Sequence, residues 1–398
     1  MNPIHQQTFL ITGASGFLGS HIALRLLAGG HRVFMLVRSG KKESAFSRVR
    51  RLLDWFGVRE DQLSGLEVLT GDLEQQGLGL EGRDAQLLAG GVDEVIHCAS
   101  DTSFSVRKRE RVERTNVRGL EHLLDVVQKN PCRAFHLMST AYVAGRRCGL
   151  CPEDFVQAEG FHNVYEETKF RAEQIAARRC AQAGIILFVH RPSIVYGDAV
   201  TGKSLNFKAL YYPIRMLHFF QRLYTKDILE NDGSRARVMN VHLDPDGILH
   251  LPLRIASSDS CGLNLIPVDH FIRAFMAIRQ ESPEGGVFHI VNPRSTTIRQ
   301  LAEYTQRFFQ LGGICITHPE EFEKHPRNAL ELLFEDHIRF YGPYMQDART
   351  FEHSKTSAIL ASQNIICPDF SYEIFETCMS YALAVDWGRF LHREQGRS

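Results

Sequence analysis

Near its start the chain carries a glycine-rich segment, Thr12–Gly19 (TGASGFLG), between an apolar run at 8–12 and a stretch with helical spacing, Phe17–Ala28. A strand, a glycine turn and a helix in this order form a unit that holds phosphate groups, because backbone N–H groups and the positive end of the helix meet the ligand. Without this context the glycine pattern is weak, since a glycine-rich turn also arises by chance. In this context it predicts a phosphate-binding loop.

The three glycines of this segment have different expected tasks. Gly13 allows a tight turn, Gly16 lets the backbone approach a pyrophosphate, and Gly19 allows the helix to pack closely against the sheet. Their spacing is G-x-x-G-x-x-G rather than the G-x-G-x-x-G of the simplest dinucleotide-binding folds. The loop is therefore expected to seat the pyrophosphate of a dinucleotide.

The first 200 residues alternate between apolar strand-like runs and helix-like stretches. The predicted strands are Thr8–Thr12, Arg32–Val37, Leu66–Thr70, Glu94–Cys98, Ala134–Met138 and Ile185–His190. The predicted helices are Phe17–Ala28, Ala45–Phe56, Arg111–Gln128 and Val164–Ala183. Because polar residues do not alternate along the strands, both faces of the sheet are expected to be covered. The prediction is an α/β fold with a doubly wound parallel sheet, a Rossmann fold.

Residues 201–398 are expected to form a smaller region that covers the substrate, without a flexible linker to the dinucleotide-binding domain of residues 1–200. The predicted elements are a helix at Leu205–Tyr224 interrupted by Pro213, a strand or turn region at His242–Pro252, a strand at Gly262–Pro267, a helix at Asp269–Arg279 and a strand at Val287–Val291. The strands near 262–291 are expected to return to the first domain. The last hundred residues are expected to be mixed helix and loop.

Composition narrows the class of protein. The chain has 46 Lys and Arg residues and 46 Asp and Glu residues, and this balance argues against a nucleic-acid-binding protein. No apolar run approaches the roughly 20 residues of a membrane span, and residues 1–7 resemble neither a signal nor a transit peptide. The nine cysteines are scattered and odd in number, which fits reduced thiols. A cytoplasmic protein is therefore expected.

No metal site is predicted. Cys148 and Cys151 form a lone C-x-x-C without a second pair of ligands at zinc-finger spacing. His318 and His353 show no metal-ligand spacing either, so ordinary loop and packing positions are the expected reading.

The residue after the second predicted strand indicates which cofactor the loop prefers. Proteins that prefer NAD usually have Asp or Glu there, which binds the ribose 2′-hydroxyl. Here the position is Arg38, 19 residues beyond Gly19, and Lys41, Lys42 and Arg48 follow. A guanidinium pairs with a 2′-phosphate in bidentate geometry. The expected cofactor is NADPH, and solvated surface charges are the alternative.

Two further segments carry candidate catalytic groups. Tyr165 and Lys169 are four residues apart at the start of a predicted helix, so both lie on one face, where an ammonium would lower the pKa of the phenol. Such a pair alone is weak evidence. It gains weight from Ser139 and Thr140 after the fifth predicted strand, because the carboxyl ends of parallel strands line the ligand site. Thr140 is expected to bond the substrate oxygen, with Ser139 as the alternative.

These motifs, in this order, resemble the extended short-chain dehydrogenase/reductase superfamily over residues 8–295. The supporting segments are Thr12–Gly19, Gly71–Leu73, His97–Ser100, Thr115–Gly119, Thr140, Tyr165, Lys169, Arg191–Val195 and Ile266–Asp269. The resemblance implies that Thr140, Tyr165, Lys169 and Asn116 are the catalytic residues. The cofactor-binding residues that the motifs imply are Gly13, Ser15, Gly16, Phe17, Leu18, Gly19, Arg38, Arg48, Asp72, Leu73, Ala99, Ser100, Tyr165, Lys169, Pro192, Ser193 and Ile194.

Within this superfamily the chain more closely resembles the thioester-reductase and fatty acyl-CoA reductase branch. The segments that carry this resemblance are Leu36–Arg38 with Ala45 and Arg48, His97–Phe104 and Ser139–Val143. The resemblance implies an NADPH-dependent reductase of lipid metabolism that transfers hydride to an acyl thioester, acyl-CoA or acyl-carrier protein, and forms an aldehyde or an alcohol. No adenylation domain, carrier domain or eukaryotic reductase C-terminal domain is recognisable, so a stand-alone reductase is expected.

Two other functions remain open on the same residues. One is an NAD(P)-dependent epimerase, dehydratase or hydroxysteroid-type dehydrogenase of the extended short-chain family, against which Arg38 argues. The other is a non-catalytic dinucleotide-binding protein, against which Thr140 and the Tyr165–Lys169 pair argue. The sequence indicates neither the oligomeric state nor the chain length of the acyl group.

An aromatic stretch after residue 205 also has more than one interpretation. Its apolar residues are Phe207, Leu210, Tyr211, Tyr212, Ile214, Met216, Leu217, Phe219 and Phe220. Helical spacing of such residues is typical of core packing, but an acyl tunnel or a peripheral contact with a membrane surface would use the same pattern.

Overall fold

The computed structural model describes residues 6–59, 63–130, 132–157 and 159–389. The chain folds into two compact units. Unit 1 comprises Met1–Ser193, His270–Val291 and Phe351–Ile366, and unit 2 comprises Ile194–Asp269, Asn292–Thr350 and Cys367–Ser398. The boundary that was expected at residue 200 therefore falls at residue 193, and two later segments belong to unit 1 as well.

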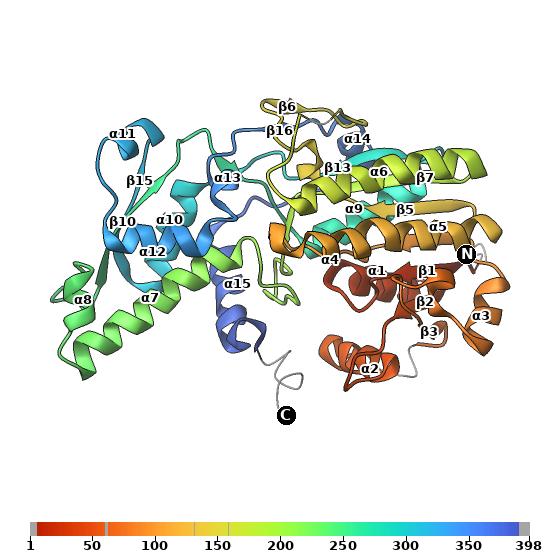
Figure 1. Cartoon of the computed structure of the whole chain (residues 1–398), viewed down its shortest axis with the longest axis horizontal. Coiled ribbons are helices and arrows are strands. Elements are labelled where there is room, and N and C mark those ends of the chain that lie inside the picture. Colours follow the sequence, from red (N-terminus) through yellow and green to blue (C-terminus); the bar gives the residue numbers. More distant parts are fainter. Residues whose placement is uncertain (1–5, 60–62, 131, 158, 390–398) are drawn as a thin grey trace. The chain divides into compact units, whose positions relative to one another are not determined.

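Unit 1 is built on a seven-stranded parallel sheet of order β13-β7-β5-β4-β1-β2-β3 (Figure 1). Its strands are β1 Thr8–Thr12, β2 Arg32–Val37, β3 Leu66–Thr70, β4 Glu94–His97, β5 Ala134–Met138, β7 Ile186–Pro192 and β13 Gly286–Ile290. The order reverses between β1 and β4, and doubly wound folds bind their ligands outside the carboxyl ends of the strands at such a reversal. The predicted α/β fold with a doubly wound parallel sheet is confirmed.

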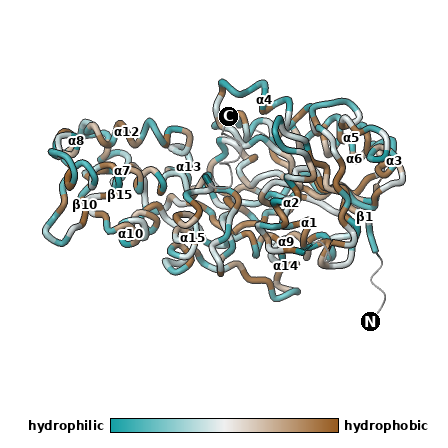
Figure 2. The backbone as a smooth tube through the Cα atoms, turned by 90° about the horizontal axis from the view of Figure 1, so that it is seen from below, coloured by the Kyte–Doolittle hydropathy of each residue, from teal (hydrophilic) through white to brown (hydrophobic). Residues whose placement is uncertain are grey.

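Helices pack on both faces of this sheet. The helices of unit 1 are α1 Phe17–Ala28, α2 Ala45–Phe56, α3 Gly82–Ala89, α4 Arg109–Glu113, α5 Gly119–Lys129, α6 Val164–Ala183, α14 Ser354–Ser362 and, from His270 onward, α9 Val268–Glu281. Leu124 of α5 and Ala172 of α6 share an apolar cluster with Phe135 of β5. The next residue, His136, points to the other face, where its ring lies 5.5 Å from the ring of Phe275 in α9. Hydrophobic stretches fill the interior of unit 1, whereas α4 is hydrophilic (Figure 2).

The helix that the sequence predicts at Arg111–Gln128 is not continuous. A π-helical segment, Arg114–Arg118, separates α4 from α5 and carries Asn116. Such wide turns are rare and often occur at functional sites. Hydrophobic spacing does not reveal the wide turn, because apolar residues keep helical spacing on both sides of it.

The strands predicted near 262–291 belong to different sheets. β13 joins the large sheet, where it pairs with β7. The run predicted as one strand, Gly262–Pro267, forms β11 Gly262–Leu263 and β12 Leu265–Pro267, which pair within unit 2 with β14 Thr296–Thr297 and β8 Ile194–Tyr196. Asn264 lies between the two strands, and its side-chain amide forms two hydrogen bonds with the backbone of Asn292.

Unit 2 contains a three-stranded sheet of order β15-β10-β9. Its strands are β9 His242–Leu243, β10 Leu249–Ala256 and β15 Leu311–Thr317, and its helices are α7 Tyr211–Glu230, α8 Ser234–Val238, α10 Ile298–Phe309, α11 Pro319–Glu323, α12 Ala329–Ile338, α13 Gly342–Met345 and α15 Tyr372–Ala384. Two short strands lie outside these sheets: β6 Leu150–Cys151 in unit 1, and β16 Thr350–Phe351 where the chain passes from unit 2 to unit 1. β15 lies where helix and loop were expected, because its two glycines hide the strand pattern.

The aromatic stretch forms most of α7. Pro213 was expected to interrupt this helix, but the helix is continuous. Pro213 lies in its first turn, where a missing N–H has little cost. Tyr211, Leu217 and Phe220 are buried in the core of unit 2, whereas Phe219 is half exposed. Of the three interpretations of the aromatic stretch, core packing is the one that these buried side chains show. In the described part of the chain, no helix has the length and hydropathy that a membrane crossing requires.

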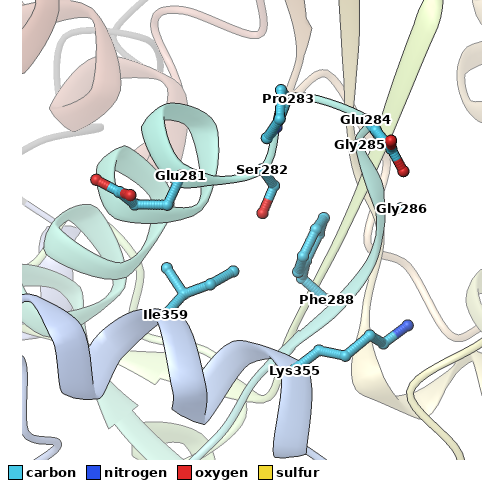
Figure 3. Close-up of a pocket in the computed structure, with 9 residues that line it drawn as sticks. All are labelled: Glu281, Ser282, Pro283, Glu284, Gly285, Gly286, Phe288, Lys355 and Ile359. Atoms are coloured by element: carbon cyan, nitrogen blue, oxygen red, sulfur yellow. The ribbon is translucent and has the colours of Figure 1, made fainter.

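A late segment of the chain, residues 351–366, belongs to unit 1 and contains α14. The buried carboxylate of Glu153 caps this helix, since it accepts the N–H of Lys355 at 2.8 Å and that of Thr356 at 3.3 Å. A cavity of about 360 Å³ lies between α14 and the turn from α9 to β13, with Phe288 and Ile359 on its lining (Figure 3). None of the predicted site residues lines it.

Candidate active site

The loop between β1 and α1 leaves little room for side chains. Gly13 has a φ of +66°, and a β-carbon there would lie 2.5 Å from the Ala99 backbone nitrogen after β4. A β-carbon on Gly19 would lie 2.4 Å from the Gly13 carbonyl oxygen. The structure therefore has the tight turn expected at Gly13 and the close packing expected at Gly19, and it adds a close approach of Gly13 to the end of β4.

The amino end of α1 is suited to a phosphate group. Its cap residue is Gly16, which has no side chain to accept a hydrogen bond. The first turn of the helix, all of whose residues the structure describes, holds no acidic residue. By contrast, the side chains of Ser44 and Asn163 cap α2 and α6. The positive end of α1 is thus not neutralised by its own cap or first turn, and a pyrophosphate fits this end of the helix.

Two arginines lie beside this loop. Arg48 of α2 donates to the Arg38 carbonyl oxygen at 2.7 Å and to Ser15 Oγ at 3.4 Å. Burial lowers the pKa of Arg48 from its usual value. Arg38 is more exposed, and its guanidinium lies 3.8 Å from a carboxylate oxygen of Asp72 and 3.7 Å from one of Glu74. The structure therefore brings together four residues that the sequence predicts as cofactor-binding.

Tyr165 and Lys169 occupy one face of the first turns of α6, close to the end of β5. Lys169 is buried, and its Nζ donates to the Met138 carbonyl oxygen at 2.7 Å. The Thr140 side chain hydrogen-bonds the Tyr165 hydroxyl. Lys169 Nζ lies 6.0 Å from the centre of the Tyr165 ring. The three residues predicted from separate motifs are therefore neighbours.

The ionisation of this group differs from the sequence-based expectation. Burial raises the pKa of Tyr165 to about 12, although the Thr140 hydrogen bond favours the phenolate. Burial therefore outweighs the lowering of the phenol pKa that was expected from the lysine. Burial lowers the pKa of Lys169 itself to about 8. In the protein alone, the neutral phenol is thus a hydrogen-bond donor near neutral pH.

Asn116 connects the end of β4 to α6. Its Oδ1 accepts from Ser100 Oγ at 3.2 Å and from the Asp101 N–H at 2.7 Å. Its Nδ2 donates to the Asp101 carbonyl at 3.0 Å and to Thr168 Oγ1 at 3.0 Å. The side chain is buried and its amide is fully used, which fits a supporting rather than a reacting group. Sequence reasoning did not single out Thr168.

The choice between Ser139 and Thr140 follows from their partners. Ser139 Oγ donates to a carboxylate oxygen of Glu173 at 2.5 Å, so its hydroxyl points away from Tyr165. Glu173 in turn forms a buried bidentate ion pair with Arg191, at 2.9 and 2.7 Å. The sequence analysis missed this pair. The available signal was the spacing of Tyr165, Lys169 and Glu173, each four residues apart on one helix face.

The segment after β7 was expected beside the nicotinamide. Pro192 ends β7, and the Ser193 N–H donates to the Ile290 carbonyl at 3.1 Å. Ser193 Oγ is buried and has no hydrogen-bond partner in the described part of the chain. A buried hydroxyl without a partner is unfavourable, so a polar ligand atom would stabilise it. Ile194 belongs to unit 2, as the first residue of β8.

The remaining predicted residues lie near the same ends of the strands. Phe17 and Leu18 form the first turn of α1 and are partly exposed, and the Phe17 carbonyl accepts from His21 Nδ1 at 2.8 Å. The Leu73 carbonyl accepts from His122 Nδ1 at 2.8 Å, and the preceding carboxylate, that of Asp72, accepts the Glu74 N–H at 3.0 Å. Their part in cofactor binding stays a prediction.

Metal ligands do not cluster in what the structure describes. No group of three or more His, Cys, Asp and Glu side chains is arranged to hold an ion among residues 6–59, 63–130, 132–157 and 159–389. Cys148 is exposed and Cys151 is buried.

Residues 11–275 match the NAD-binding protein family described as male sterility protein. The chain belongs to this family. The predicted resemblance to the extended short-chain dehydrogenase/reductase superfamily and its thioester-reductase branch is confirmed. The predicted enzyme class, an NAD(P)-dependent oxidoreductase of the short-chain type, is confirmed as well.

Among curated relatives, a linear gramicidin synthase from Brevibacillus parabrevis is 24% identical over 400 residues, which is 96% of this chain and 7% of that protein. Equisetin synthetase eqxS from Fusarium heterosporum is 32% identical over 186 residues, or 46% of this chain and 4% of that protein. The chain thus spans a small fraction of these relatives. Both are named as synthases or synthetases, so the expectations of a fatty acyl-CoA substrate and of lipid metabolism gain no specific support from them.

Solved structures share the fold. The terminal R domain of the myxalamid PKS-NRPS biosynthetic pathway has a TM-score of 0.73 at 21% identity, covering 97% of this chain and 92% of that one. A UDP-glucuronic acid 4-epimerase from Bacillus cereus, in complex with NAD, has a TM-score of 0.61 at 17% identity, covering 95% and 99%. At these identities the likeness concerns the fold alone.

Proposed function

We propose that this chain is an NADPH-dependent reductase of acyl thioesters that forms an aldehyde or an alcohol. The observation that carries the proposal is the grouping of Thr140, Tyr165 and Lys169 at the end of β5, in unit 1 with the phosphate loop. Membership of the male sterility protein family supports it. Resemblance to a myxalamid R domain and to a thiolation-reductase di-domain supports a thioester rather than a sugar substrate.

The residues of the phosphate loop fit a dinucleotide. A side chain at Gly13 or Gly19 would collide with backbone atoms. A side chain at the cap residue, Gly16, would stand at the helix end where the phosphates bind. Ser193 Oγ offers a buried polar group without a partner among the described residues. Arg38 and Arg48 would pair with the 2′-phosphate that distinguishes NADPH from NADH. Bound NADPH would supply the hydride.

The side chains of the site would then handle the thioester oxygen. The Thr140 and Tyr165 hydroxyls would donate hydrogen bonds to this oxygen, where negative charge develops. Tyr165 would give it a proton, and the protonated Lys169 would hold the cofactor ribose and help the phenol to release the proton. Reduction of the thioester carbon releases a thiol and an aldehyde, and a second reduction gives the alcohol.

The carrier of the acyl group is proposed to be a carrier protein. The solved thiolation-reductase di-domain of an archaeal non-ribosomal peptide synthetase supports this choice over coenzyme A, since that protein joins a thiolation domain to a reductase domain. The direct test offers the purified chain acyl groups on coenzyme A and on a phosphopantetheinylated carrier protein, with NADPH or NADH, and follows oxidation of the reduced nicotinamide. Faster turnover of the carrier-bound group with NADPH is expected.

Other outcomes of this assay would favour the other functions. Purified protein with stoichiometric NAD and no affinity for NADPH would indicate an epimerase or dehydratase. Tight NADPH binding without turnover of any thioester, aldehyde or alcohol would indicate a non-catalytic dinucleotide-binding protein.

Arg38→Ala should weaken NADPH binding about tenfold and leave NADH binding nearly unchanged, because one charge-assisted hydrogen bond contributes roughly 1.5–3 kcal/mol. Fluorescence titration of the two reduced cofactors measures this. The matched control is Arg51→Ala. Arg51 lies on α2 and pairs with Glu43 at 3.1 Å, and this variant should bind both cofactors like the wild type. Equal losses for NADPH and NADH in Arg38→Ala would remove the support for NADPH preference.

The rate of thioester reduction should fall as the pH rises through about 8. Burial lowers the pKa of Lys169 to about 8, so the ammonium that holds the ribose and assists the phenol is lost above this pH. A profile of kcat/KM against pH measures the effect. A rate that stays constant well above this range would contradict the proposed role of Lys169.

A further inference from the structure

The ion pair between Glu173 and Arg191 lies directly behind the catalytic group. Both side chains are almost fully buried, with about 1% exposed. Arg191 Nε and Nη2 donate to the two carboxylate oxygens of Glu173, while Nη1 donates to the Asp154 carbonyl at 2.8 Å and lies 3.3 Å from His289 Nε2. The guanidinium is thus held on three sides and fixes the position of the carboxylate.

The carboxylate reaches the strand end that carries Thr140. Ser139 Oγ donates to Glu173 at 2.5 Å, and Lys169 Nζ donates to the Met138 carbonyl at 2.7 Å. Two side chains one turn apart on α6 therefore hold two consecutive residues at the end of β5. The next residue along the chain is Thr140, which hydrogen-bonds Tyr165.

We infer that Glu173, fixed by Arg191, is a positioning residue of the active site: it holds the end of β5 so that Thr140 meets Tyr165. Its carboxylate also places negative charge one helical turn from Lys169 on α6. This inference rests on the proposed function, and it concerns how the same site is kept in order. A buried ion pair of this kind is weak evidence for stability alone, because desolvation offsets most of its attraction.

Of the titratable groups described around Lys169, Glu173 is the one that carries a negative charge. Burial raises the pKa of Cys98 to about 12 and that of Tyr165 to about 12, so both are neutral near pH 8. Burial and the nearby lysine lower the pKa of His97 to about 3, so its ring is neutral as well. Burial lowers the pKa of Lys169, whereas Cys98 and, to a smaller extent, the Glu173 carboxylate raise it. Among the described groups around Lys169, Glu173 therefore provides the anion at this pH.

The first experiment replaces Glu173 by glutamine, which keeps an acceptor for Ser139 but removes the charge. NADPH binding is followed by fluorescence across the pH range. In the wild type, binding should weaken as the pH rises through about 8, and in Glu173→Gln this weakening should begin at lower pH. Glu173→Asp, which keeps the charge, should restore the wild-type profile. This readout does not depend on thioester turnover.

The matched control is Glu94→Gln. Glu94 is also fully buried and forms a bidentate pair with an arginine, Arg279, but it lies at the opposite, amino end of β4. Its loss should lower the melting temperature and leave the pH dependence of NADPH binding unchanged. If Glu173→Gln behaves like Glu94→Gln, with lower stability and an unshifted profile, the pair is merely structural and the inference is overturned.

Ser139→Ala tests the link to the strand in a variant that leaves the Glu173–Arg191 pair intact. It should lower kcat of thioester reduction about tenfold, because misplacement of a catalytic group slows the chemical step. KM for the thioester and affinity for NADPH should be nearly unchanged. A kcat equal to that of the wild type would overturn the positioning role. Absence of thioester turnover in the wild type would instead refute the proposed function, while the binding profiles would still decide the role of Glu173.

Discussion

Tyr165→Phe should lower kcat of NADPH-dependent thioester reduction about a thousandfold, since a positioned general acid contributes roughly 10²–10⁴-fold. The variant lacks the hydroxyl that donates to the substrate oxygen and that Thr140 contacts. Its ring remains and can keep the neighbour Phe104, whose ring centre lies 6.0 Å away. Melting temperature and NADPH affinity should therefore change little. Single-turnover rates and fluorescence titration measure the two effects separately.

The control for this variant is Tyr372→Phe. Tyr372 also begins a helix, α15, and its hydroxyl lies 3.2 Å from Glu376 at an exposed position. Its loss should leave the rate of reduction unchanged. Turnover of every thioester by Tyr165→Phe at the wild-type rate would show that the proposed catalytic group is wrong.

Gly19→Ala should destabilise the protein by about 3 kcal/mol, in the range of overpacking in a rigid core, and weaken NADPH binding at least about tenfold. A β-carbon at this position would lie 2.4 Å from the Gly13 carbonyl oxygen and 2.9 Å from the carbonyl carbon. Both atoms are backbone, so the loop itself must move to relieve the clash. Denaturant unfolding and cofactor titration measure the two losses.

The matched substitution is Gly342→Ala. A β-carbon at Gly342 meets no atom within 4 Å, and its φ is not in the left-handed region. This variant should therefore keep the stability and the NADPH affinity of the wild type. If Gly19→Ala behaves in the same way, the close packing of the loop on itself does not control the cofactor site.

Local sequence patterns predicted much of unit 1. The predicted strands Thr8–Thr12, Arg32–Val37 and Ala134–Met138 and the predicted helices Phe17–Ala28 and Val164–Ala183 agree with the structure. These elements are unambiguous because each is bounded by turn residues or caps and keeps one hydrophobic period along its length. The phosphate loop was visible for the same reason, since strand, glycine turn and helix are adjacent in the chain.

Features that depend on distant parts of the chain were not visible. The sequence favoured Thr140 over Ser139, but it did not contain the partner of Ser139, the side chain of Glu173, which lies 34 residues further along the chain. The lysine was expected to lower the pKa of the phenol, but burial raises that pKa. Burial is a property of the folded environment, which the spacing of two residues on a helix does not contain.

By itself the sequence determined the parallel sheet, the phosphate loop and the pairing of Tyr165 with Lys169, because each follows from residues within a few positions of one another. The tertiary structure alone decided that Ser139 binds Glu173, that Glu173 pairs with Arg191, and that residues 351–366 return to unit 1. These outcomes rest on contacts between residues far apart in the chain and on the removal of charges from water, and only the folded chain brings both about.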